Sequence, residues 1–252
     1  MQTLAILLAA GKGTRMRSDL AKVLHRFAGE PLVVHPLRAA RAFGVERSIL
    51  VIGHQGEAVR AAVSERLPAG EGWVIDFAVQ AEQHGTGHAV ACALPVIDPE
   101  FRGAVLILSG DVPLLGVETL GRLARACEGS SAGISLASFR PADPSGYGRI
   151  VRDESGRVMG IREHKDASPA ELAIAECNAG VYCVLVEHLR EELPGLGSGN
   201  ASGEVYLTDL IGVRARAGEV VVVEVDADEV AGVNTPEQLA ELEQRARSRG
   251  LV

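Results

Sequence analysis

The sequence predicts an α/β fold: a Rossmann-like, mostly parallel sheet with helices on both faces, to which a strand-rich lobe is attached. In the first half of the 252-residue chain, short runs of continuous apolar residues alternate with amphipathic segments. Continuous apolar runs are typical of strands buried on both faces, and strands that alternate with helices form parallel sheets. In the second half, strand-like runs follow one another, and this change predicts the attached lobe.

The first half divides into four expected strands and three expected helices. The apolar runs predict strands at 4–9, 48–53, 74–79 and 104–110. Apolar residues three and four apart predict the helices between them, at 31–43, 57–67 and 87–94. Pro31 suits the first position of the first helix, whereas Pro36 fits poorly inside it and is expected to end its first turn.

The second half is expected to contain strands at 134–139, 148–153, 157–163 and 176–184. The segment Glu154-Ser155-Gly156 predicts a hairpin turn between the middle two. Residues 141–148 and 194–203 are too rich in Gly, Pro and Ser for regular elements and predict loops. A final helix is expected from Pro236 to the end of the chain, with Thr235 as its cap and Gln238 completing a capping box.

Charge and cysteine content exclude several classes of protein. The formal net charge is -8, which argues against nucleic-acid and membrane-surface binding because both need a cationic surface. The four cysteines show no C-x-x-C spacing, which fits small buried thiols in a reduced compartment. The chain begins without a basic leader, and no apolar run approaches the roughly 20 residues of a membrane span, so we expect a cytoplasmic protein. The sequence is compatible with a homo-oligomer but does not indicate one.

A glycine-rich loop, residues 10–16, directly follows the first expected strand. Gly11 and Gly13 leave the backbone bare, so amide groups there can point at a phosphate. Between Gly11 and Arg26 there are five basic residues against one acid, a local surplus of positive charge in an acidic chain. That surplus is suited to a polyphosphate, although an ordinary glycine-rich turn with a solvated basic face has the same sequence pattern.

Two other phosphate-binding motifs are excluded by direct comparison. A P-loop requires G-x-x-x-x-G-K-[ST], and the chain has Gly-Lys-Gly-Thr at 11–14. A dinucleotide fingerprint requires G-x-G-x-x-G, and Met16 occupies the last position. A redox enzyme that binds a nicotinamide cofactor is therefore disfavoured.

Two polar residues follow buried strands, where open α/β sheets bind ligands. Asp111 follows the strand at 104–110, and a carboxylate there suits Mg²⁺. Gly-Asp-x-Pro is equally good turn chemistry, so a structural role for Asp111 stays open. Gln80 follows the strand at 74–79 and can present a donor and an acceptor to a base edge, or it is a solvated loop residue.

Two histidines four residues apart, His84 and His88, raise the question of a zinc site. Gly85 and Gly87 lie between them and disfavour a rigid helical metal site. We therefore interpret His88 as a packing or capping residue.

Ordered blocks of the sequence resemble the sugar-nucleotide pyrophosphorylases. The first block runs from Leu8 to Met16 as L-A-A-G-K-G-T-R-M and continues through 18–24. The further blocks are Gln80–Ala89, Gly110–Leu114, Gly146–Ile150, Glu163–Asp166, Asn178–Gly180, Glu204–Asp209 and Gly232–Asn234. They span about residues 4–240 and are most similar to the uridylyltransferase domain of the bifunctional N-acetylglucosamine-1-phosphate uridyltransferase/glucosamine-1-phosphate acetyltransferase family.

The resemblance implies a nucleotide-diphospho-sugar transferase fold and an Mg²⁺-dependent transfer of a uridylyl group from UTP to N-acetylglucosamine 1-phosphate. The product, UDP-N-acetylglucosamine, is a peptidoglycan and cell-wall precursor. The implied catalytic residues are Lys12 and Arg15, which hold the departing pyrophosphate, and Lys22, which holds the phosphates being joined. The implied metal ligands are Asp111 and Asn234, although Asn234 alone is equally well interpreted as a turn residue ahead of the Thr235 cap.

The resemblance also implies a set of substrate-binding residues. Gln80 reads uracil with the Gly85-Thr86 backbone, Glu163 binds sugar hydroxyls, and Gly148 and Asn178 hold the N-acetylhexosamine in the strand-rich lobe. The complete set is Leu8, Ala9, Ala10, Gly11, Gly13, Gln80, Gly85, Thr86, Ser109, Gly110, Gly148, Glu163 and Asn178.

The chain departs from the family pattern in three places. The family usually has Tyr where this chain has Ser109, and Asn-Thr-Gly where it has Asn178-Ala179-Gly180, which leaves glucose 1-phosphate or another nucleotide open as a substrate. The bifunctional enzymes continue into a β-helix, whereas this sequence ends after a single helix. We therefore expect a nucleotidyltransferase domain at 1–235 and a C-terminal helix at 236–252, without acetyltransferase activity, in either a truncated chain or a stand-alone enzyme.

An alternative from a different class is a nucleotide-sugar-binding module without turnover. A protein that only binds a nucleotide sugar does not need residues that hold a metal ion and a departing pyrophosphate. The chain has the full set of residues that the resemblance implies for these tasks, which argues for an enzyme: Lys12, Arg15, Lys22, Asp111 and Asn234.

Overall fold

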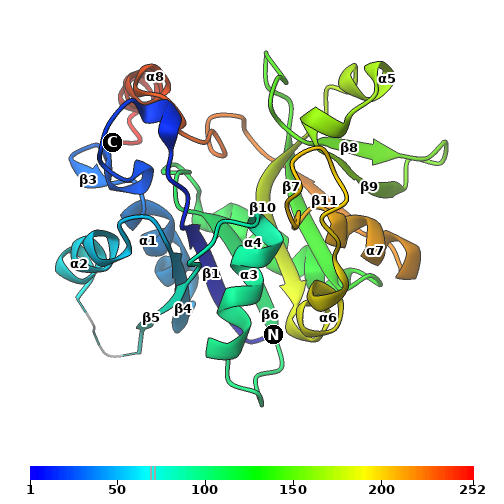
Figure 1. Ribbon diagram of the computed structural model, residues 1–252, viewed down its shortest axis with the longest axis horizontal. Helices are drawn as coiled ribbons and strands as arrows, with labels where there is room; N and C mark the ends of the chain where they lie inside the picture. The colour runs from blue at the N-terminus through cyan, green and yellow to red at the C-terminus, as the bar shows by residue number, and fades with distance from the viewer. Residues whose placement is uncertain (69, 71) are drawn as a thin grey trace.

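The computed structural model describes residues 1–68, 70 and 72–252, and its centre is a mostly parallel sheet (Figure 1). Within the described residues the main path of the sheet has the strand order β11-β7-β10-β6-β1-β4-β5. These strands are β1 (Thr3–Ala9), β4 (Arg47–Ile52), β5 (Val74–Val79), β6 (Ala104–Ser109), β7 (Ile134–Phe139), β10 (Cys177–Leu185) and β11 (Val221–Glu224). Along this path of described strands, β10 alone runs antiparallel to its neighbours, β6 and β7, so the expected α/β class is confirmed.

Helices cover both faces of this sheet because its strands are apolar on both sides. Leu4 and Ile6 of β1 pack with α3 (Thr86–Ala93), α6 (Val186–Glu192) and α7 (Asp209–Ala217). Ala5 and Leu7 pack with α1 (Val34–Phe43), α2 (Gly56–Arg66) and α4 (Val117–Gly129) on the opposite face. Alternate side chains of a strand point to opposite faces, which explains why the apolar runs are continuous.

The strand-rich lobe is smaller than expected from the sequence. The hairpin of β8 (Arg149–Arg152) and β9 (Val158–Arg162) projects from the sheet through the pairing of Arg149 with Cys177, and its predicted turn at 154–156 is confirmed. The runs at 134–139 and 176–184, expected in the same lobe, instead form β7 and β10 inside the main sheet. The short helix α5 (Pro169–Leu172) lies beside the hairpin (Figure 1).

The first helix begins later than predicted. Pro31 lies in a two-stranded ribbon of β2 (Arg26–Phe27) and β3 (Glu30–Pro31), and α1 starts at Val34. Pro36 is the third residue of α1, where the backbone N–H has no partner within the helix, so it neither ends the first turn nor breaks the helix. The prediction for both prolines was therefore wrong.

The C-terminal helix α8 (Pro236–Ser248) packs against the glycine-rich loop and the ribbon that follows it. Leu242 and Ala246 are buried in one cluster with Met16, Phe27 and Leu32, and the two segments lie together in Figure 1. The Thr235 side chain accepts a hydrogen bond from the Gln238 N–H, as predicted.

The capping box predicted at α8 is only half formed. The Gln238 side chain accepts its hydrogen bond from the N–H of Asn234, at 2.8 Å, rather than from that of Thr235. The first turn of α8 therefore fixes the backbone of Asn234. Among the described residues, no helix has both the length and the apolar character that a membrane span requires.

Candidate active site

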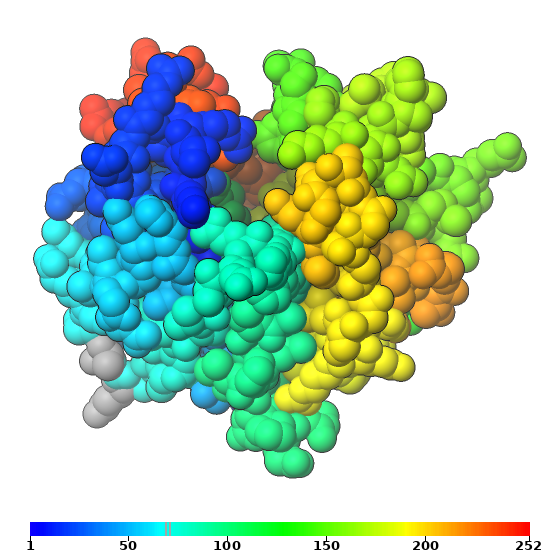
Figure 2. Space-filling view, in the orientation of Figure 1, coloured from blue at the N-terminus to red at the C-terminus, as the bar shows by residue number. Residues whose placement is uncertain are grey.

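Two adjoining cavities lie at the carboxyl ends of β1 and β6. Their volumes are about 280 and 250 Å³, and both are lined by Leu8, Thr86, Ser109 and Asp111. Figure 2 shows the hollow between the N-terminal loop, in blue, and the segments coloured green to gold. This is the edge at which open α/β sheets bind ligands, because the loops after parallel strands converge there.

The two glycines of the glycine-rich loop have different physical reasons to be there. Gly13 has a φ of 63°, and a Cβ built on it would lie 2.3 Å from the Cβ of Lys22. Gly11 has an ordinary φ, and a Cβ built on it would meet nothing within 4 Å. Gly13 is therefore required by the fold of the loop, whereas Gly11 leaves space open beside the first cavity, which it lines.

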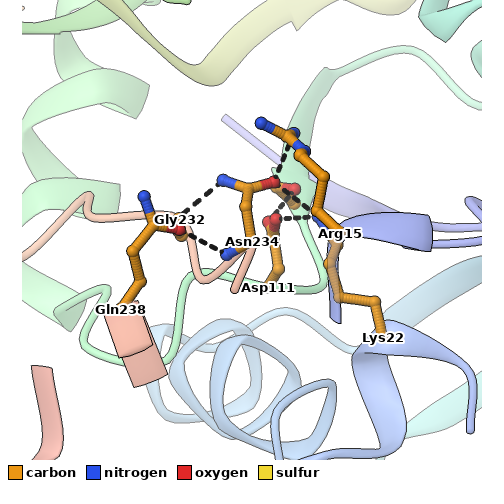
Figure 3. Close-up of polar contacts among 7 residues, drawn as sticks. Arg15, Lys22, Asp111, Gly232, Asn234 and Gln238 are labelled. Atoms are coloured by element: carbon orange, nitrogen blue, oxygen red, sulfur yellow. Dashed lines mark hydrogen bonds and ion pairs between the residues drawn. The ribbon is translucent and has the colours of Figure 1, made fainter. Parts of the chain in front are cut away.

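Four polar side chains from distant parts of the chain form a cluster beside the cavities, which we call the cation cluster: Arg15, Lys22, Asp111 and Asn234 (Figure 3). The Lys22 ammonium contacts Asp111 Oδ2 and lies 3.2 Å from Asn234 Oδ1. The Arg15 guanidinium donates to the same Asn234 oxygen at 2.9 Å. One carboxylate and one amide oxygen are thus directed at a single cationic group.

Neighbouring groups hold both oxygens in place. The Ser109 hydroxyl donates to Asp111 Oδ1 at 2.5 Å. The Asn234 amide nitrogen donates to the Gly232 carbonyl at 3.2 Å, which turns Oδ1 toward Lys22 and Arg15. Asp111 itself is 7% exposed, and a buried carboxylate needs such partners.

The cation cluster offers oxygen ligands of the kind that Mg²⁺ prefers. Asp111 and Asn234 already converge on one cation, the Lys22 ammonium, so their geometry fits a metal ion at the same position. Mg²⁺ commonly takes only one or two protein oxygens and completes its shell with water and substrate phosphates. Among the described residues there is no group of three or more His, Cys, Asp and Glu that could hold a metal.

The first cavity extends from the cation cluster to Gln80. Gln80 is 4% exposed, and its amide nitrogen contacts the Gly85 carbonyl at 3.0 Å and His88 Nδ1 at 3.2 Å. Gly85 has a φ of 104°, and a Cβ on it would lie 2.5 Å from the Val205 carbonyl, so only glycine fits. His88 makes a specific polar contact here, which goes beyond the packing or capping role expected from the sequence.

The second cavity extends from the cation cluster to the strand-rich lobe. Glu163 accepts a hydrogen bond from the Thr208 hydroxyl at 2.8 Å. Burial raises the pKa of Glu163; the Thr208 hydrogen bond opposes the rise, and nearby carboxylates add to it. The Asn178 amide donates to the Tyr182 hydroxyl at 2.6 Å and its oxygen accepts from the Gly180 N–H. These hydrogen bonds set which polar atoms remain for a ligand.

Most of the residues predicted to form the site do line the two cavities. The first is lined by Leu8, Ala9, Ala10, Gly11, Lys22, Gln80, Gly85, Thr86, Ser109 and Asp111. The second adds Gly148, Glu163, Asn178 and Asn234. Four predicted residues line neither: Lys12, Gly13, Arg15 and Gly110.

Those four have different surroundings. Arg15 belongs to the cation cluster and Gly13 packs against Lys22. Gly110 donates to the Leu8 carbonyl at 3.0 Å, where β1 and β6 are in close contact. The Lys12 side chain is exposed on the loop, and within the described part of the chain it forms no ion pair or hydrogen bond.

Sequence reasoning missed several residues that contribute to these cavities, among them Gln83, Tyr147, Tyr182 and Thr208. Gln83 donates to the Ala10 carbonyl at 2.8 Å and ties the loop after β5 to the glycine-rich loop. Tyr147, Tyr182 and Thr208 line the second cavity. Gln83, Tyr147 and Thr208 lie inside the motif blocks, so position within a block was a usable signal, whereas Tyr182 reads only as a strand residue.

The fold and the site together define a nucleotide-binding α/β enzyme of the nucleotidyltransferase class. Residues 5–217 match the model of the MobA-like NTP transferase domain, and the chain belongs to that family. The predicted relationship to nucleotidyltransferases is thereby confirmed.

Several curated relatives carry the name bifunctional protein GlmU. The chain is 52% identical over 236 residues to the one from Anaeromyxobacter sp. (strain Fw109-5), covering 94% of this chain and 47% of the relative. It is 48% identical over 248 residues to the one from Pelobacter propionicus, covering 97% and 52%. It is 46% identical over 252 residues to the one from Cellvibrio japonicus, covering 98% and 53%. The chain spans about half the length of the curated relatives it matches.

Proposed function

We propose that the chain transfers a uridylyl group from UTP to N-acetylglucosamine 1-phosphate, with Mg²⁺, and releases pyrophosphate. The observation that carries this proposal is the pair of cavities with a shared wall, by which we mean Leu8, Thr86, Ser109 and Asp111. The cation cluster lies at this wall. A group transfer between two substrates needs two binding regions that meet at the reacting atoms. The similarity to relatives named bifunctional protein GlmU supports the substrate pair that the sequence motifs imply.

The reaction is an in-line displacement at phosphorus. An oxygen of the sugar phosphate forms a bond to the α-phosphorus of UTP, the bond from that phosphorus to the β-bridging oxygen breaks, and pyrophosphate leaves with the bond electrons. The attacking phosphate is already anionic at neutral pH, so no side chain has to remove a proton. Catalysis then consists of positioning and of stabilising the negative charge on the phosphates.

The residues of the two cavities and of the adjacent glycine-rich loop divide this work. Gln80 with the Gly85-Thr86 backbone holds the base, and Gly11 and the neighbouring amides receive the phosphates. Lys22 stabilises the phosphates being joined, and Arg15 with Lys12 binds the departing pyrophosphate. Gly148, Glu163 and Asn178 hold the sugar in the second cavity.

Asp111 and Asn234 are the residues that would hold Mg²⁺. Their oxygens already converge on one cation, and Ser109 and Gly232 fix their orientation. When bound there, the ion neutralises charge on the α-phosphate, which lowers the repulsion that the anionic nucleophile meets.

The test is pyrophosphate release by the purified chain with UTP and Mg²⁺, using N-acetylglucosamine 1-phosphate and glucose 1-phosphate side by side. We expect Arg15→Ala and Asp111→Ala to reduce turnover by at least ~10²-fold, the usual effect of losing one such electrostatic contact. The matched control is Arg17→Ala, because Arg17 is 76% exposed and pairs with Glu237 on α8. Turnover near the wild-type rate in both site variants, with the fold intact, would contradict the assignment.

The sugar arm of the test decides between the two substrates that the sequence left open. Ser109 places a small hydroxyl, engaged with Asp111, where the family usually has Tyr, so the shared wall differs in shape. Release with glucose 1-phosphate alone would keep the mechanism and change the substrate. Binding of UDP-sugar by calorimetry without any release would indicate a binding module.

A further inference from the structure

The amide of Gln80 is held by two protein groups, and they fix which way it points. Its nitrogen lies 3.0 Å from the Gly85 carbonyl oxygen and 3.2 Å from His88 Nδ1. A carbonyl oxygen only accepts hydrogen bonds, so the atom of Gln80 that faces Gly85 must be the NH₂ group. The second hydrogen of that NH₂ group is directed at His88.

The same argument fixes the tautomer of His88. Because Gln80 donates to Nδ1, that nitrogen must be the acceptor, and the ring hydrogen sits on Nε2. His88 Nε2 lies 3.6 Å from the sulfur of Cys92, one turn further along α3, which is able to accept it. Gln80 thus donates to both Gly85 and His88, and His88 donates in turn to Cys92, so every donor in this group of four residues faces an acceptor.

The carbonyl oxygen of Gln80 remains for a ligand. Among the described residues no group donates a hydrogen bond to Oε1. This oxygen is nevertheless not fully buried, so part of its surface is accessible. Since Gln80 is otherwise buried and lines the first cavity, the accessible surface of Oε1 faces that cavity. The cavity therefore presents a fixed acceptor at this point.

We propose that His88 is a positioning residue for nucleotide specificity: it holds the Gln80 carbonyl toward the base, where it accepts the ring N3–H of uracil. This inference rests on the proposed function, in which Gln80 binds the base of the nucleotide. Cytosine carries a lone pair instead of a hydrogen at N3. If it bound in the same position as uracil, its N3 and the Gln80 carbonyl would be two acceptors facing each other. Without an acceptor on residue 88, the Gln80 amide loses one of the two contacts that hold it and is free to turn, which weakens the preference for UTP over CTP.

The chain offers a matched set of variants for this test. In His88→Asn the side-chain oxygen takes the place of Nδ1, so it still accepts from Gln80. In His88→Gln the polar group moves to the position of Nε2, and His88→Leu removes both. The same substitution at the neighbouring histidine, His84→Asn, is the control: the His84 side chain is 58% exposed and contacts Glu82, and its ring centroid lies 5.2 Å from that of His88. This variant therefore removes the contact between the two rings and leaves the hydrogen bond between His88 and Gln80 in place.

Two measurements are made on each variant: the kcat and KM for UTP and CTP from pyrophosphate release, and the affinities for UTP and CTP by calorimetry. For His88→Leu and His88→Gln we expect the KM and Kd for UTP to rise about 10-fold, the loss of roughly one hydrogen bond, with kcat nearly unchanged. The preference for UTP over CTP should fall with them, and His88→Asn and His84→Asn should keep it.

The outcomes separate this inference from the proposed function. If the wild-type chain binds UTP in preference to CTP but releases no pyrophosphate, the proposed enzymatic function is contradicted. The role of His88 can then still be tested by the calorimetric affinities. An unchanged preference in His88→Gln and His88→Leu, or its loss in His88→Asn as well, overturns the inference while the enzyme stands. A wild-type chain that binds UTP and CTP equally overturns it too. If His88→Leu fails to fold, the comparison of His88→Asn with His88→Gln decides, since a purely structural role would treat these two alike.

Discussion

Gly13 and Gly11 allow the role of the glycine-rich loop to be tested with a matched pair of substitutions, Gly13→Ala and Gly11→Ala. Alanine at Gly13 would keep a φ of 63°, which costs a residue with a Cβ roughly 1–2 kcal/mol. Its Cβ would lie 2.3 Å from the Lys22 Cβ, well inside the ordinary separation of about 3.5–4.0 Å, so the two segments must move apart. Overpacking of this kind costs about 1–3 kcal/mol.

The expected loss for Gly13→Ala is therefore about 2–5 kcal/mol of unfolding free energy, with turnover reduced further because Lys22 leaves the cation cluster. Gly11→Ala meets no atom within 4 Å and no unusual φ, so its stability should stay within about 0.5 kcal/mol of wild type. Its turnover should nevertheless fall, because its methyl group occupies space left for phosphates. Urea unfolding and pyrophosphate release measure the two effects. Equal stability losses in both variants, or a fully active Gly13→Ala, would refute the reasoning.

Three further predictions concern single side chains. Ser109→Ala removes the donor that orients Asp111, and we expect the Mg²⁺ concentration for half-maximal turnover to rise about 10-fold, which a metal titration at saturating substrate measures. Because burial raises the pKa of Glu163, the folded state holds that proton more tightly than the unfolded chain, and the stability this gives at low pH is lost as the pH rises through the folded pKa. Glu163→Gln should therefore be more stable than wild type at about pH 8 and lose this advantage near pH 4; urea unfolding with an advantage at both pH values would contradict it. The pKa of Glu176 is shifted in the opposite direction, because the Arg152 hydrogen bonds lower it. The stability that these bonds give is therefore present above the unfolded pKa and is lost as the pH falls through the folded pKa. Arg152→Ala should cost about 1–3 kcal/mol at neutral pH and progressively less below about pH 4, and a cost independent of pH would exclude the ion pair as its cause.

The fold could be predicted from the sequence where one physical signal dominated. The strands β1, β4 and β6 are buried on both faces, and their continuous apolar runs located each to within one residue. The apolar run of the half-buried edge strand β5 located that strand as well. The pattern of apolar residues did not predict the structure where contacts with segments distant in sequence decide it. The helices α4, α6 and α7 and the edge strand β11 were not predicted, and β7 and β10 were placed in the lobe because strand pairing is not encoded locally.

The candidate site was predictable as far as the motifs reached. The predicted glycines, Gln80, Asp111 and Asn234 lie in short motif blocks that can be recognised in the sequence. The contacts that give those residues their roles depend on atoms far apart in sequence, such as Arg15 and Asn234, which are 219 residues apart. Lys12 illustrates the limit, because the same loop that places Lys22 in the cation cluster leaves Lys12 exposed.

The shared wall of the two cavities explains why substitutions in this site should fall into two kinds. Leu8 of β1 pairs with Ser109 of β6, so the wall is fixed by two adjacent central strands. In-line transfer requires the attacking and leaving oxygens on opposite sides of one phosphorus, and the wall is the region that both cavities reach. Changes at the wall, such as Asp111→Ala, should therefore lower kcat, whereas changes at the far ends, at Gln80 or Glu163, should raise KM for one substrate and leave the other unaffected.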